Sequence, residues 1–231
     1  MTLPQNSPDT LDETLDETLD ASTEPRALNL NVAARIPKTE AEGPGQRYAL
    51  WLQGCHLRCP GCCNPHMLAF EDAEWISVEA IAAEICATPD IEGLTVVGGE
   101  PFAQASALSR VAELVRDAGL SVMVFSGYTL KHLRRAQNPD YERLLVNIDL
   151  LVDGPYIERD RVTDRRWIGS SNQRVHFLTE RYAHLRDSET GWDDESNTVE
   201  IRISGGVITV NGFPHDDITS LIAKLEGRTS E

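Results

Sequence analysis

Short apolar stretches alternate with helical patterns between about residue 27 and residue 155. The expected strands cover 27–34, 48–53, 94–97, 121–125 and 148–152. Apolar residues at helical spacing lie between them, around 78–86, 108–115 and 129–136. This alternation is typical of parallel strands in a sheet that is covered on both faces. The pattern therefore predicts an α/β fold that binds its ligands at the carboxyl ends of the strands.

Four polar or glycine-rich motifs come directly after four of these strands. They are the cysteine-rich loop 54–65, Gly98-Gly99-Glu100-Pro101, Ser126-Gly127 and Asp153-Gly154. Because the carboxyl ends of parallel strands lie at the same edge of a sheet, we expect the four motifs to meet there. The sequence thus predicts one functional site that is built from four turns.

The 231-residue chain is acidic, with 21 Lys and Arg against 37 Asp and Glu and a formal net charge of −16. This charge argues against binding nucleic acid through broad phosphate neutralisation, which needs a basic face. The chain has no run of about 18 apolar residues, and its N-terminus lacks the pattern of a secretory signal. We therefore expect no nucleic-acid partner, no membrane span and a cytoplasmic location.

The ends of the chain differ from its middle. Residues 1–26 hold the repeat LDETLDETLD, and we expect a disordered acidic tail there, with a docking segment as the alternative. The folded domain is expected to cover 27–231, with an exposed acidic loop at 180–197. Residues 198–203 and 207–211 flank Ser204-Gly205-Gly206 and predict a β-hairpin. Asp216 can cap a final helix that ends near residue 226.

The five cysteines indicate metal or redox chemistry rather than a disulfide framework, because four of them fall within nine residues and the total is odd. Cys55, Cys59 and Cys62 form CxxxCxxC. Three thiolates on one loop can hold three irons of a cubane and leave the fourth iron without a protein ligand. A zinc site that adds His56, His66 or Cys63 is the alternative, although structural zinc sites usually combine two separated pairs of ligands.

Other residues near these motifs have simpler interpretations. Cys63 is expected to be a free thiol near the cluster, and Cys86 a small core residue on the apolar face of its helix. Trp51 and Trp75 are expected to be packing residues. His176, inside a strand-like segment, is expected to be structural.

Several local sequences resemble the radical S-adenosylmethionine (radical SAM) superfamily, and most closely its small activating enzymes of glycyl-radical enzymes such as anaerobic ribonucleotide reductase. These sequences are GPGQRYALWLQGCHLRCPGCCNP, VVGGEPF, FSGYTL, DLLVDGPY, RWIGSSNQRV and VEIRISGGVITVNGFP. They cover about 27–178 and the expected hairpin. The resemblance implies a partial, open (β/α) barrel of the radical SAM type, followed by a C-terminal β-hairpin and helix.

The resemblance also implies a role for each motif. Cys55, Cys59 and Cys62 would ligate a 4Fe-4S cluster, and the open iron would bind S-adenosyl-L-methionine (SAM). The SAM contacts would be Gly98, Gly99 and Glu100 at the methionyl amino group, with Ser126 and Asp153 as further contacts. One-electron reduction would cleave SAM to a 5′-deoxyadenosyl radical, which would take a hydrogen atom from a backbone glycine of the partner enzyme. The expected partner is anaerobic ribonucleotide reductase.

Two other functions are left open by the sequence. One is a small radical SAM enzyme with a different, small-molecule or peptide substrate, and the other is a non-enzymatic zinc or iron-sulfur module. The segment 158–166 adds four arginines in an otherwise acidic chain: Arg159, Arg161, Arg165 and Arg166. They form either a solvated, salt-bridged face or a docking site. A docking site there would bind an acidic electron donor such as flavodoxin, or the partner enzyme near residues 170–173.

Overall fold

The computed structural model describes residues 28–187, 192, 198–205 and 207–213. The expected N-terminal tail, the final helix and most of 188–197 lie outside the described residues. No helix in the described part of the chain combines the length and apolar character that crossing a bilayer requires.

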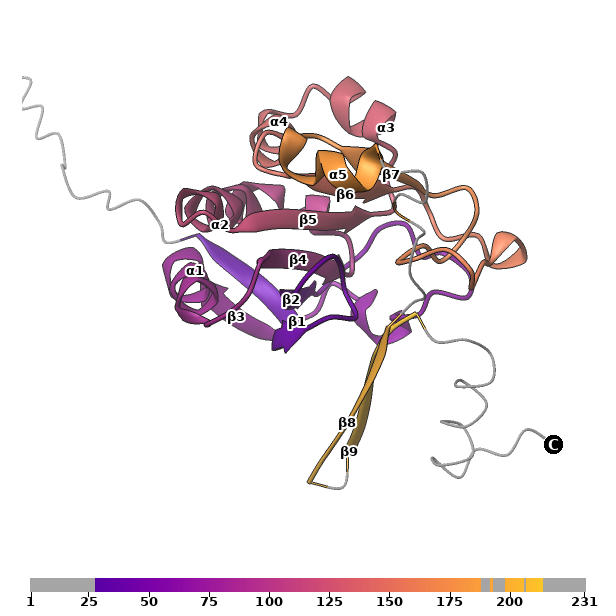
Figure 1. Ribbon diagram of the computed structural model, residues 1–231, viewed down its shortest axis with the longest axis horizontal. Helices are drawn as coiled ribbons and strands as arrows, with labels where there is room; N and C mark the ends of the chain where they lie inside the picture. Colours follow the sequence, from indigo (N-terminus) through magenta and orange to yellow (C-terminus); the bar gives the residue numbers. More distant parts are fainter. Residues whose placement is uncertain (1–27, 188–191, 193–197, 206, 214–231) are drawn as a thin grey trace, which may run out of the picture.

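The described residues form a seven-stranded sheet in the order β3-β1-β2-β4-β5-β6-β7 (Figure 1). Its strands are β1 (Asn29–Thr39), β2 (Arg47–Leu52), β3 (Glu74–Ser77), β4 (Gly93–Gly98), β5 (Ser121–Ser126), β6 (Leu150–Asp153) and β7 (Arg174–Phe177). The inner strands β2, β4, β5 and β6 pair in parallel, which confirms the α/β fold. The outer strands pair antiparallel. The connection from β1 to β2 is a short glycine-rich turn, and a turn of that length can only join antiparallel strands.

The inner strands end in step with one another. Leu52 of β2 lies opposite Gly98 of β4, and Ser126 of β5 lies opposite Asp153 of β6. The turns that follow these strands therefore start at one edge of the sheet, which we call the rim. This arrangement is the one that the four motifs predict.

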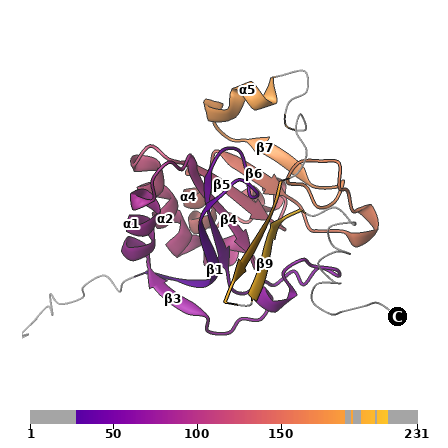
Figure 2. The same ribbon diagram turned by 60° about the horizontal axis from the view of Figure 1, so that its bottom comes forward.

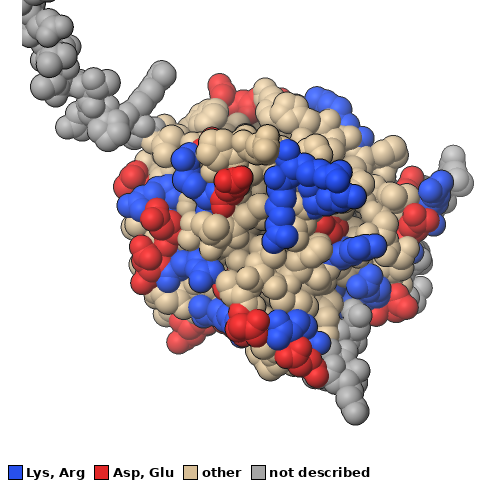
Figure 3. Space-filling view, turned by 90° about the horizontal axis from the view of Figure 1, so that it is seen from above, with Lys and Arg blue, Asp and Glu red and all other residues tan. Residues whose placement is uncertain are grey.

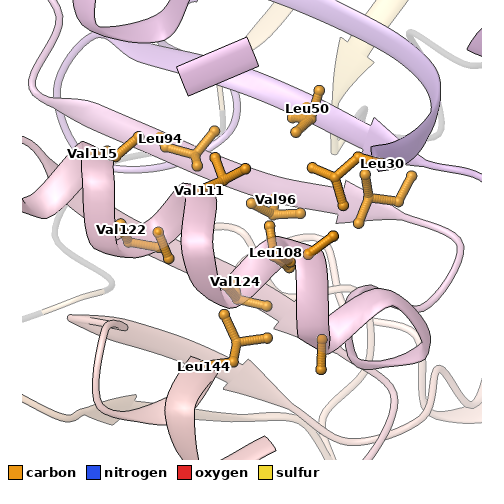
Figure 4. Close-up of a cluster of buried hydrophobic side chains, with 14 of the residues drawn as sticks. Leu30, Leu50, Leu94, Val96, Leu108, Val111, Val115, Val122, Val124 and Leu144 are labelled. Carbon is orange, nitrogen blue, oxygen red and sulfur yellow. The ribbon is translucent and has the colours of Figure 1, made fainter. Parts of the chain in front are cut away.

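The helices are α1 (Val78–Ala87), α2 (Ala105–Asp117), α3 (Leu130–Arg135), α4 (Pro139–Leu145) and α5 (Ala183–Arg186). The helices α1, α2 and α4 lie against the same face of the sheet (Figures 1 and 2). The core between α1, α2, α4 and the sheet is fully apolar, and Figure 4 shows part of it, including Leu50, Val96 and Leu108. Alternate residues of each strand point into this core, as strand geometry requires.

Polar side chains start three of these helices. Ser77 Oγ accepts a hydrogen bond from Ala80 N at 3.2 Å, and Thr129 Oγ1 accepts one from His132 N at 3.2 Å. Asn138 Oδ1 accepts one from Asp140 N at 2.9 Å before α4. Such caps satisfy amide groups that have no partner inside the helix. The cap predicted at Ser77 is confirmed, whereas α4 was not predicted.

The other face of the sheet is covered mainly by loop segments, together with short helical segments. Met123, Leu150 and Val152 pack there against Trp167 and Ile168 from the segment that follows β6. Part of the region expected to be an exposed loop joins this cluster. Glu180–Tyr182 forms a 3-10 helix and Ala183–Arg186 forms α5, with the Tyr182 and Trp192 side chains buried. Aromatic burial therefore outweighs the polar composition of 180–197.

The predicted C-terminal hairpin is confirmed as β8 (Val199–Ser204) and β9 (Val207–Gly212), which extends away from the sheet in Figure 1. Its polar side faces the body of the protein: Asn211 Nδ2 donates to Thr39 Oγ1 at 2.8 Å, and Gly212 N donates to Glu42 Oε1 at 2.9 Å. Ile203 is 73% exposed. Hydrogen bonds, more than apolar packing, therefore hold the base of the hairpin.

Two packing predictions are wrong. Cys86 is exposed rather than part of the core, because it lies at the edge of the apolar stripe of α1 that Val78, Ile81 and Ile85 form. Trp75 is 57% exposed on the edge strand β3, where no further strand covers it. Trp51 is buried as expected.

Candidate functional site

The cysteine-rich loop begins where β2 ends at the rim. Its base is closed by two backbone hydrogen bonds, from Gly54 N to Met67 O at 2.9 Å and from Cys55 N to Leu68 O at 3.2 Å. The Gln53 side chain adds a bond from its Nε2 to Ala69 O at 2.8 Å. The loop is thus anchored at both ends while its cysteines remain free of disulfides.

The three thiols of the CxxxCxxC motif lie near one another. Cys55 is buried, and Cys59 and Cys62 are partly buried. Burial raises the pKa of Cys59, and the neighbouring Cys55 and Cys62 raise it further. A hydrogen bond from the exposed Cys63 lowers the pKa of Cys62 to about 6. Cys63 therefore lies beside the motif as a free thiol, as predicted.

No three His, Cys, Asp or Glu side chains among the described residues form a group that could hold a single metal ion. This absence does not argue against an iron-sulfur cubane, because each cysteine of a cubane binds a different iron.

The Glu100 carboxylate connects the turn after β4 with the turn after β5. Its Oε1 accepts hydrogen bonds from Ser126 Oγ at 2.9 Å and from Phe102 N at 3.0 Å, and its Oε2 accepts one from Gly127 N at 2.9 Å. Burial raises the pKa of Glu100 to about 7, although these hydrogen bonds oppose the increase. The structure thus brings Glu100 and Ser126 together, as the rim predicts.

The glycines of the β4 turn let it contact the cysteine loop backbone to backbone. Gly99 N donates to Leu52 O at 2.7 Å, and Glu100 N donates to Gly54 O at 2.9 Å. A Cβ on Gly99 would lie 2.2 Å from Gly54 O, and Gly98 has a φ of +101°, which favours glycine. Any side chain at Gly99 would therefore push the two turns apart.

Asp153 lies at the rim, but its carboxylate already has protein partners. Asp153 Oδ2 accepts a hydrogen bond from Leu130 N at 2.6 Å, at the first residue of α3. It also lies 2.9 Å from Nε2 of His176 on β7. The hydrogen bond from Leu130 N gives Asp153 a structural role, while the SAM contact at Asp153 and the structural role of His176 stay predictions.

Two aromatic residues that the sequence did not single out lie beside the site. Tyr128 follows Gly127, and its ring stacks on that of His132 with centroids 4.8 Å apart and an interplanar angle of 11°. Burial raises the pKa of Tyr128, and the nearby Glu100 and Cys55 raise it further. Tyr128 therefore links the turn after β5 with α3. The only signal in the sequence was its place directly after the Ser126-Gly127 motif.

An open groove of about 530 Å³ lies beside the cysteine loop. Its walls include His56 from the loop and the exposed rings of Phe70 and Trp75. The His56 and Phe70 rings lie 4.3 Å apart. No pattern in the sequence predicted this groove, because it forms between residues from separate elements.

The residues at the rim fit an iron-sulfur cluster. Three thiols on one anchored loop form the kind of donor set that holds such clusters. The glycine turn after β4 packs directly against this loop, because Gly54 O lies where a Cβ on Gly99 would be.

The comparisons with known proteins agree with this donor set. The family model of the 4Fe-4S single cluster domain matches residues 41–176. The chain belongs to this family. The matched region contains all four motifs of the rim, including the cysteine loop.

Curated relatives carry the name anaerobic ribonucleoside-triphosphate reductase-activating protein. The protein of this name from Vibrio cholerae is 31% identical over 65% of this chain and 99% of its own length. Those from Escherichia coli K12 and from phage T4 are 28% and 27% identical, over 99% and 96% of their lengths. The resemblance to small activating enzymes is thereby confirmed. Among solved structures, QueE from Escherichia coli is similar with a TM-score of 0.37 and 19% identity, over 44% of this chain and 53% of that one.

Proposed function

We propose that this chain is a radical SAM activating enzyme that forms a glycyl radical on anaerobic ribonucleotide reductase. The observation that carries the proposal is the contact of the three-cysteine loop with the Gly98–Glu100 turn, in a chain that spans 99% of a relative named for this activation. An oxidoreductase of this class combines a cluster that has one open iron with a SAM site next to it.

Cys55, Cys59 and Cys62 would hold the 4Fe-4S cluster, and SAM would bind between it and the Gly98–Glu100 turn. The bound pair supplies a one-electron cleavage of the sulfonium, which yields a carbon radical. The protein positions and shields the reactants while the cofactor carries the chemistry. Gly98 and Gly99 let the turn after β4 lie directly against the cysteine loop, next to the place where the methionyl end of SAM would bind.

Glu100 is suited to accept hydrogen bonds from an ammonium group. Its carboxylate is 1% exposed and held by Ser126, Gly127 and Phe102, so it needs little rearrangement when a cation binds. Ser126 would act through Glu100 as a positioning residue. Asp153 would add a further contact while it fixes the start of α3.

A glycine-bearing segment of a partner has to reach this site. The sheet has β3 and β7 at its two ends, and the rim lies between them. We interpret the sheet as a partial, open barrel whose mouth admits that segment. A one-electron donor protein such as flavodoxin would supply the reducing equivalent.

Cysteine variants test this function. Anaerobically reconstituted wild-type protein is expected to bind about four irons per chain. With dithionite and SAM it is expected to release 5′-deoxyadenosine. Cys55→Ala, Cys59→Ala and Cys62→Ala are each expected to lose the cluster and this activity, because each removes an iron ligand. Cys63→Ala is the matched control and is expected to keep both.

Electron paramagnetic resonance then identifies the partner. After incubation with the activated wild-type protein, anaerobic ribonucleotide reductase is expected to show a glycyl-radical signal. Deoxyadenosine release without that signal would instead favour a different substrate. One tightly bound zinc ion and no cleavage of SAM would contradict the proposal altogether.

A further inference from the structure

The exposed face of α3 is basic although the chain is strongly acidic. Lys131, Arg134 and Arg135 are exposed, and their spacing of i, i+3 and i+4 puts them on one side of the helix. None of the three forms an ion pair with a residue that the structure describes. Lys and Arg side chains gather on the face that carries α3 and α4 in Figure 3. Water solvates these exposed charges in the monomer, so they are available to a partner of opposite charge.

The arginines of 158–166 each have a partner in the structure, although the Arg159 side chain is 83% exposed. Arg159 pairs with Asp160 at 3.6 Å, and the Arg166 guanidinium lies 4.0 Å from the centre of the Trp167 ring. Arg161 and Arg165 also have partners in the structure. The sequence left open whether these arginines form a salt-bridged face or a docking site. The contacts of Arg159 and Arg166 lie within their own segment, whereas the cations of α3 pair with no residue that the structure describes.

The basic face of α3 is linked to the cysteine loop through a short series of contacts. His132, the neighbour of Lys131, stacks on Tyr128, and Tyr128 follows Gly127, whose N donates to Glu100 Oε2 at 2.9 Å. Leu57 of the cysteine loop packs against Gly127, where a Cβ would come within 2.3 Å of its side chain. The next loop residue, Arg58, is exposed as well. A protein bound to α3 would therefore touch the molecule near the three cysteines.

We propose that α3, with Lys131, Arg134 and Arg135, is the docking surface for an acidic protein that donates one electron to the cluster. This inference rests on the proposed function, because the function requires a reductant. A net charge of −16 repels an acidic protein over most of the surface, so a local basic face selects both the partner's charge and its orientation. The donor loses one electron and the oxidised cluster gains it, with no bond made or broken.

The test compares two double variants with the same change in charge. Lys131→Glu/Arg135→Glu reverses two charges on α3. Lys38→Glu/Arg110→Glu reverses two charges on β1 and α2, where each native residue takes part only in an exposed ion pair. Binding of flavodoxin, the acidic probe, is measured by fluorescence anisotropy at low and at high ionic strength. The rate of cluster reduction by reduced flavodoxin and by dithionite is measured by stopped-flow absorbance.

The α3 variant is expected to bind flavodoxin about tenfold or more weakly at low salt and to be reduced more slowly by it. Dithionite should reduce both variants at the wild-type rate. High salt should weaken wild-type binding and shrink the difference between variants. If the α3 variant fails to fold, Lys131→Gln/Arg135→Gln replaces it, with about a threefold loss of affinity expected.

Equal losses in the two double variants, or none in the α3 variant, would overturn the docking surface. So would a wild-type protein that does not bind flavodoxin at low salt. These results are independent of the proposed function, which fails instead if dithionite-reduced wild-type protein releases no 5′-deoxyadenosine.

Discussion

Gly99 determines how closely the turn after β4 approaches the cysteine loop. The turn contributes two backbone hydrogen bonds to the end of β2, and the Gly54 carbonyl occupies the space where a side chain would lie. The sequence placed this glycine at the rim correctly. It could not show that Gly54 is the contact, because the two residues are far apart in the chain and meet only through the register of β2 and β4.

A methyl group at this position is expected to separate the two turns. Gly99→Ala would bring a Cβ within 2.2 Å of Gly54 O, so the backbone must move, at a cost of about 1–3 kcal/mol in the free energy of unfolding. We expect reduced SAM affinity as well, measured by equilibrium dialysis on the reconstituted protein.

Gly119→Ala is the control for that substitution. Its Cβ would meet nothing within 4 Å, but its φ of +84° strains an alanine by about 1–2 kcal/mol. It should therefore lose stability and keep SAM affinity. The role given to the Gly99 contact is wrong if both variants keep wild-type affinity.

At the scale of elements, the sequence predicted those strands and helix ends that local residue patterns determine. Periodicity located the inner strands, and Ser77 marked the start of α1. Elements whose structure depends on distant contacts were less predictable. The part of 180–197 around Tyr182 is helical and packed, because residues from other segments enclose the Tyr182 ring. Cys86 is exposed because α1 is rotated so that this side chain points away from the sheet.

The base of the hairpin is expected to depend on pH through Glu42. This carboxyl group accepts a hydrogen bond from Gly212 N, and burial raises its pKa from 4.5 to about 8. Between these two values the folded state binds more protons than the unfolded state, so the free energy of unfolding falls as pH rises. The slope is on the order of 1 kcal/mol per pH unit.

Glu42→Gln is expected to remove this slope and to be more stable than the wild-type protein at pH near the upper value. Urea unfolding over the window gives the slope, and hydrogen exchange at the Gly212 amide reports on the hairpin itself. Glu40→Gln changes an exposed neighbour and should leave the slope as it is. Parallel pH profiles for wild-type and Glu42→Gln proteins would refute the assignment.

At the scale of the whole molecule, one buried arginine joins elements that are far apart in sequence. Arg47 on β2 is fully buried, and it donates from Nε to Thr95 Oγ1 at 3.0 Å and from Nη1 to Tyr182 OH at 3.1 Å. Burial lowers its pKa. The sequence could not predict this network, because an arginine at the start of a strand is usually exposed and its partners lie 48 and 135 residues away.

Arg47→Lys is expected to reduce the free energy of unfolding by about 3 kcal/mol, because a lysine leaves buried oxygens without donors. Arg35 on the adjacent strand pairs with Glu74 and Glu84 near the surface, so Arg35→Lys should cost at most about 1 kcal/mol. Denaturant titrations of both variants make the comparison. Similar losses in the two would show that the Arg47 network contributes little.

The inner strands end at the same edge of the sheet. The segments that carry the site residues therefore lie outside the hydrogen-bonded part of the sheet. Residues can be added to or removed from the segments beyond that edge without shifting any ladder of backbone hydrogen bonds, since the pairing of Leu52 with Gly98 and of Ser126 with Asp153 is complete before those segments begin. Changes in these loops can therefore alter which macromolecule the protein binds, while the apolar core stays the same.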